Sequence, residues 1–89
     1  MTGELETDYE DSRLRVVVSD TAAALFVNGV ERDRKPFDNA SGNLYLSSSV
    51  QTGYEWHEFI EATVTYSTDE VIVEIRASNR QLAREQLAA

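Results

Sequence analysis

The stretch EATVTYSTDEVIVEIR, residues 61–76, decides the fold class of this chain. On either side of the segment Ser67-Thr68-Asp69-Glu70, apolar residues occupy every second position. A pattern that repeats every two residues puts alternate side chains on opposite faces of a β-strand. Ser, Thr and Asp favour turns. The stretch therefore predicts an antiparallel hairpin with one buried face.

A second hairpin is predicted upstream, in residues 22–30, which read AAALFVNGV. Asn28-Gly29 separates two apolar segments, and this pair favours a type I′ turn because both of its residues adopt a positive φ there. A two-residue turn places Val27 opposite Val30. The returning residues 31–35 are all charged, which is typical of a strand at the edge of a sheet.

Other parts of the chain give weaker signals of regular structure. Residues 14–18 and 44–47 alternate in the same way and predict strands. The apolar residues of segment 54–60 fit the spacing of either a helix or a strand. The last segment, 78–88, favours a helix because it opens on a possible capping box and is rich in strong helix formers.

These elements together predict a mostly β domain of the α+β class. We expect one antiparallel curved sheet or small barrel of about five to six strands, with a short C-terminal helix. A sandwich of two sheets usually needs more strands than the pattern reveals. The length of 89 residues allows one small domain rather than two.

Charge is distributed unevenly along the chain. There are 16 acidic and 8 basic residues, for a net charge of -8. Residues 1–12 hold several acids and no base, which predicts a flexible acidic N-terminal tail followed by a single β-rich domain over residues 13–89. Binding to a phosphate backbone needs clustered Lys and Arg, so we expect no nucleic-acid partner.

Composition excludes several other classes of protein. The chain has no cysteine, so it contains neither a disulfide nor a thiolate metal site. No apolar run approaches the roughly 20 residues that a membrane-spanning helix requires. We therefore expect a cytoplasmic protein with no membrane partner.

Candidate chemistry is sparse. His57-Glu58-Phe59-Ile60-Glu61 resembles the zinc-protease motif His-Glu-x-x-His, but Glu61 stands at the second His position and His57 is the only histidine. No serine lies in a nucleophile-elbow pattern. We expect no catalytic residues, no bound metal and no cofactor, and the sequence predicts a protein that is not an enzyme.

The sequence predicts a small acidic protein-interaction module that binds another protein or its own copy as a homodimer. The candidate contact residues are Phe26, Tyr54, Trp56 and Phe59. Phe26 belongs to a strand that is apolar on both faces, and the other three form the densest aromatic patch. Aromatic residues often anchor interfaces. The alternative, which the short chain favours, is that Trp56 and Phe59 anchor the core and Tyr54 caps its edge.

The sequence is also compatible with two alternative functions. The first is an acidic inhibitor that imitates nucleic acid and occupies a basic groove, which requires acids gathered on one folded face. The second is a β domain that binds a small ligand or a sugar by stacking on Tyr54 and Trp56.

Overall fold

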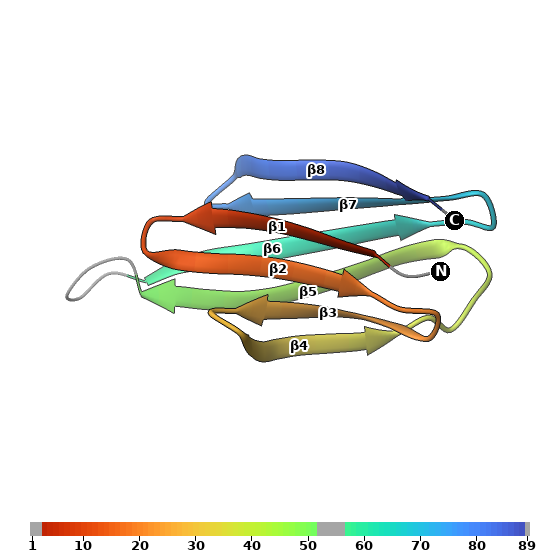
Figure 1. Ribbon diagram of the computed structural model, residues 1–89, viewed down its shortest axis with the longest axis horizontal. Coiled ribbons are helices and arrows are strands. Elements are labelled where there is room, and N and C mark those ends of the chain that lie inside the picture. The colour runs from red at the N-terminus through yellow and green to blue at the C-terminus, as the bar shows by residue number, and fades with distance from the viewer. Residues whose placement is uncertain (1–2, 52–56, 89) are drawn as a thin grey trace.

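The computed structural model describes residues 3–51 and 57–88, and its regular structure is entirely β (Figure 1). In chain order the strands are β1 (Gly3–Tyr9), β2 (Ser12–Val18), β3 (Ala22–Val27), β4 (Val30–Pro36), β5 (Gly42–Gln51), β6 (His57–Tyr66), β7 (Glu70–Ala77) and β8 (Arg80–Ala88). Over the described ranges, no helix is long and apolar enough to cross a membrane.

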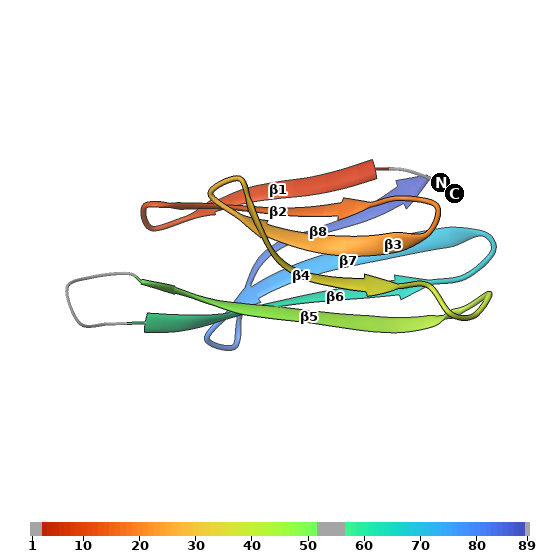
Figure 2. The same cartoon turned by 90° about the horizontal axis from the view of Figure 1, so that it is seen from below.

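The strands form two four-stranded antiparallel sheets, each in sequential order. Strands β1 to β4 make the first sheet and β5 to β8 make the second. The two sheets lie face to face (Figure 2). The chain passes from β4 at one edge of the first sheet to β5 at the edge of the second. The amide of Ser47 in β5 donates a 2.9 Å hydrogen bond to the carboxylate of Asp33 in β4. The Asp33 side chain therefore links the edge strands of the two sheets.

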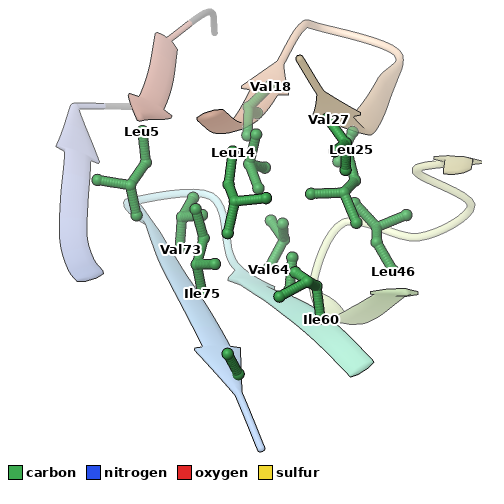
Figure 3. Packing of buried hydrophobic residues seen from close by; sticks show 14 of the residues in the cluster. Leu5, Leu14, Val18, Leu25, Val27, Leu46, Ile60, Val64, Val73 and Ile75 are labelled. Carbon is green, nitrogen blue, oxygen red and sulfur yellow. The ribbon is translucent and has the colours of Figure 1, made fainter. Parts of the chain in front are cut away.

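One hydrophobic core lies between the two sheets (Figure 3). Leu14 and Leu25 of the first sheet point toward Leu46, Ile60 and Ile75 of the second, and all five side chains are fully buried. Burying such a side chain contributes about 1.5–3 kcal/mol. The alternation seen in the sequence therefore divides each strand into a core-facing and an outward-facing set.

Both predicted hairpins are confirmed. Strands β6 and β7 pair with Val64 opposite Val73, and the intervening turn lies where the sequence predicts it. Asn28 and Gly29 have φ angles of 51° and 83°, and Val27 lies opposite Val30. The charged segment after this turn is β4, which is an edge strand of its sheet as expected.

The N-terminus differs from the predicted flexible tail, because residues 3–9 form strand β1 and pair with β2 along its whole length. Leu5 and Tyr9 enter the core. The acids of β1 alternate with these residues on the outer face, where Asp8 lies opposite Arg13 and Glu6 lies opposite Arg15. Ion pairs of 3.2–3.7 Å join the two strands. Cross-strand pairing of opposite charges thus offsets the repulsion that suggested disorder.

The predicted C-terminal helix is also wrong, because residues 80–88 form strand β8. Ser78 and Asn79 have φ angles of 50° and 68° and form a two-residue turn between β7 and β8. Leu82 and Leu87 pack against the core. A Cβ placed on Gly3 of β1 would lie 3.0 Å from the Leu87 side chain, so the first and last strands are in close contact. Tertiary packing here overrides helix propensity.

These two additional strands change the architecture. The mostly β prediction is confirmed, whereas the single curved sheet or small barrel of five to six strands is wrong. With eight strands among the described residues, the chain can cover both sides of one core and form two sheets.

Candidate interaction surface

The outer face of the first sheet carries a small apolar surface centred on Phe26. Val17 lies on β2, and Ala22, Ala24 and Phe26 alternate with the core-facing residues of β3. The two alanines are short, so their larger neighbours surround a hollow of about 110 Å³. We call these four residues and Arg34, which also lines the hollow, the Phe26 surface.

Charged side chains frame the Phe26 surface without giving it a large net charge. The guanidinium carbon of Arg15 lies 5.0 Å from the centre of the Phe26 ring, in a cation–π arrangement. Arg15 also forms a 3.7 Å ion pair with Glu4. Arg34 forms a 3.2 Å ion pair with Glu31. Each arginine at this surface is therefore matched by a carboxylate of the same molecule.

The structure does not bring the candidate contact residues together. Phe59 lies on the outer face of the second sheet, with half of its surface exposed, whereas Phe26 lies on the outer face of the first. The alternative of a core position for Phe59 is thereby wrong. Tyr54 and Trp56 lie outside the described residues, and so do the first three positions of the ambiguous segment 54–60. Its residues 57–60 belong to strand β6.

Tyr45 is a second exposed aromatic residue on the outer face of the second sheet, and the sequence analysis did not single it out. Its hydroxyl group hydrogen-bonds Glu61, and burial of the phenol together with this bond raises the pKa of Tyr45. The ammonium of Lys35 lies 6.0 Å from the centre of its ring. The alternation of residues 44–47 already indicated that Tyr45 faces away from the core.

The arrangement of His57 and Glu61 does not reproduce a metal site. Both belong to strand β6, where four residues span about 13 Å. The two side chains would share a metal only in a helix. Within residues 3–51 and 57–88, no group of three or more His, Asp or Glu side chains is placed to hold an ion.

A cluster of polar groups closes one end of the core and was also missed. The hydroxyls of Tyr9 and Ser78 both donate hydrogen bonds to the Oε2 atom of Glu58, the latter over 3.0 Å. The bond from Tyr9, followed by that from Ser78, lowers the pKa of Glu58. The hydrogen bond between Tyr9 and Glu58 also raises the pKa of the Tyr9 hydroxyl. The cluster joins β1, β6 and the turn before β8.

Comparisons of this chain with family models, with curated proteins and with solved structures gave no match.

Proposed function

We propose that this protein is a small acidic interaction module that is not an enzyme and associates with its own copy through the Phe26 surface. The observation that carries this proposal is a half-buried aromatic ring that lines a hollow on one sheet face. Enrichment of aromatic residues at the centres of interfaces is a general feature of protein association.

A second copy is the occupant that fits this surface best. In a dimer with two-fold symmetry the same surface must complement itself, so a projection and a recess must occur together. The exposed part of the half-buried Phe26 ring would supply the projection, and the hollow lined by Ala22 and Ala24 would supply the recess. Two such surfaces facing each other would place each ring over the alanines of the other copy and remove both rings from water.

Charge also favours a second copy at this surface. The chain carries a net charge of -8, so most pairs of surfaces would bring like charges together. The arginines beside Phe26 are already paired with Glu4 and Glu31. Two copies meeting here would therefore bring neutral pairs into proximity rather than unmatched acids, so the remaining repulsion would come from the net charge of the two molecules and not from the contact itself.

The experiment is sedimentation velocity on the whole chain and on two matched variants. We expect the parent protein to sediment as a dimer at micromolar concentration and Phe26→Asp to sediment as a monomer, because the new carboxylate would be buried without a partner. Phe59→Asp makes the same chemical change on the opposite sheet face, and we expect it to remain a dimer. Thermal unfolding of each variant establishes that it folds.

Two results would contradict the proposal. One is a parent protein that is monomeric at every concentration up to about 1 mM, where even an association of about -4 kcal/mol is half complete. The other is a dimer that Phe59→Asp disrupts and Phe26→Asp does not, which would assign self-association to the second sheet.

The distribution of acids argues against the nucleic-acid mimic as the leading function. Glu4, Glu6 and Asp8 do lie on one folded face, as a mimic requires. All three, however, form ion pairs with Arg13 or Arg15 of the neighbouring strand. Acids engaged in this way present little unmatched negative charge to a basic groove.

A further inference from the structure

An open pocket of about 160 Å³ lies at the end of the sandwich where three loops meet. These loops join β2 to β3, β4 to β5 and β6 to β7, and all three lie at the right-hand end in Figure 1. Phe37, Tyr66 and Val71 provide its apolar lining. The rings of Phe37 and Tyr66 meet edge to face, with their centres 4.6 Å apart.

Hydrogen bonds within the loops hold the rim of this pocket in place. The Ser19 hydroxyl accepts a 3.2 Å hydrogen bond from the amide of Ala22. The Ser67 hydroxyl accepts 3.3 Å bonds from the amides of Asp69 and Glu70. The amide of Phe37 donates a 2.9 Å bond to the carbonyl of Thr21, which ties the β4–β5 loop to the β2–β3 loop. The pocket is therefore built by loops of fixed geometry.

The charge carried by the three loops has one sign. Residues 19–21, 37–41 and 67–69 contain Asp20, which lines the pocket, together with Asp38 and Asp69, and they contain no Lys, Arg or His. An aromatic ring presents a negative face to a ligand and attracts a cation placed over it. The carboxylates and the two rings thus both favour a positively charged ligand.

We propose that this end pocket binds a small organic cation, with an ammonium group carried on a compact apolar body. The apolar part would contact Val71 and the two rings, and the positive charge would be attracted by the surrounding acids. A cavity of about 150 Å³ accommodates a single benzene ring, so the volume selects a head group of that size. This binding activity is separate from self-association through the Phe26 surface and does not depend on it.

The test compares three probes of similar shape and different charge: tetramethylammonium, tert-butanol and pivalate. Each is added to the ¹⁵N-labelled protein at constant ionic strength, and amide chemical shifts are followed by NMR. We expect tetramethylammonium alone to shift the amides of the three loops in a saturable manner, with a dissociation constant in the millimolar range, about that expected for so few ligand atoms.

Variants identify the groups responsible. Phe37→Leu keeps an apolar side chain but removes one aromatic face, and we expect the affinity for tetramethylammonium to fall about twofold to fivefold. The double variant Asp38→Asn with Asp69→Asn should weaken binding by a similar factor. Its control is Glu10→Gln with Asp11→Asn, which removes the same charge from the turn between β1 and β2 and should leave the affinity within about twofold of the parent protein.

Three results would overturn the inference. Tert-butanol or pivalate binding as tightly as tetramethylammonium would show that the pocket does not select a cation. Shifts that avoid the three loops, or no saturable shifts at all, would show that the pocket is not the site. Equal weakening by both double variants would assign the effect to net charge alone. Asp38 and Asp69 lie in exposed loops, so their double variant tests cation binding even if Phe37→Leu fails to fold.

Discussion

At the scale of single residues, Glu58 is the most informative side chain because three parts of the chain meet at it. Its carboxylate accepts hydrogen bonds from Tyr9 of β1 and from Ser78 of the last turn. Both bonds are made to the ionised form, which is why the pKa of Glu58 lies below its ordinary value. Protonation of Glu58 therefore weakens the attachment of both terminal strands.

This lowered pKa predicts how stability depends on pH. A carboxyl whose pKa is lower in the folded state stabilises the fold above its unfolded pKa, and this contribution disappears as the pH falls through the folded pKa. Urea unfolding of the parent protein and of Glu58→Gln, measured from neutral to acidic pH, checks the expectation. The parent should be the more stable at neutral pH, and the difference should shrink as the solution is acidified. A difference that is constant across this range would contradict the assigned role.

The second residue-scale prediction concerns Asn79, which has a φ of 68° in the turn between β7 and β8. Asn79→Ala should destabilise the protein by about 1 kcal/mol, because alanine adopts this left-handed conformation at a cost that asparagine partly avoids. In a helix capped by Ser78 the same change would be neutral or stabilising, because alanine is the best helix former. Urea unfolding distinguishes the two. An increase in stability would argue against the turn.

At the scale of elements, the terminal strands determine whether the sandwich is complete. Strand β1 is an edge strand of the first sheet, and β8 is an edge strand of the second. Both contribute fewer core residues than the central strands and depend on pairing with a single neighbour. In addition to this pairing and to their core contacts, the polar cluster at Glu58 links β1 to β6 and to the last turn, and the contact between Gly3 and Leu87 links β1 to β8.

The docking of β1 is tested by Leu5→Ala. Leu5 is 8% exposed and packs in the core, so its truncation should cost about 2–4 kcal/mol in the free energy of unfolding. Glu6→Ala, on the outer face of the same strand, provides the control and should cost less than about 1 kcal/mol. Denaturant titration measures both. Equal and small effects would mean that residues 3–9 do not pack on the core.

At the scale of the whole molecule, the net charge of -8 opposes the self-association that the Phe26 surface favours. Salt shortens the range of this repulsion from about 30 Å at 0.01 M to about 3 Å at 1 M. Burial of apolar area is not weakened by screening. The proposed dimer should therefore be governed by two terms that respond differently to ionic strength.

We expect the dimer to tighten as salt is added, which sedimentation equilibrium at low and high salt measures directly. Phe26→Asp is the control, because it should remain monomeric at both salt concentrations if the effect belongs to the specific surface. Weakening of the parent dimer by salt would indicate attractive charge pairs across the interface and would contradict the proposed balance of forces.

Several features follow from the sequence alone because they depend on neighbouring residues. The hairpin over residues 61–76 is set by alternation and by its turn residues. The turn at Asn28-Gly29 is set by two residues that tolerate positive φ. Alternation also places Phe26 on the opposite face of its strand from Leu25 and Val27. Each of these is a local property, so no knowledge of distant contacts was needed.

Other features were decided by contacts between distant parts of the chain. Residues 3–9 form a strand because Arg13 and Arg15 neutralise their acids and because the core accepts Leu5 and Tyr9. The segment after Asn79 is a strand because pairing with β7 and packing of Leu87 outweigh a helix propensity of only a few tenths of a kcal/mol per residue. The number of sheets, and the pocket where three separate loops meet, depend on these terminal strands and on the packing of one sheet over the other. Local sequence fixes the faces of each strand, whereas only the tertiary structure determines which faces are brought together.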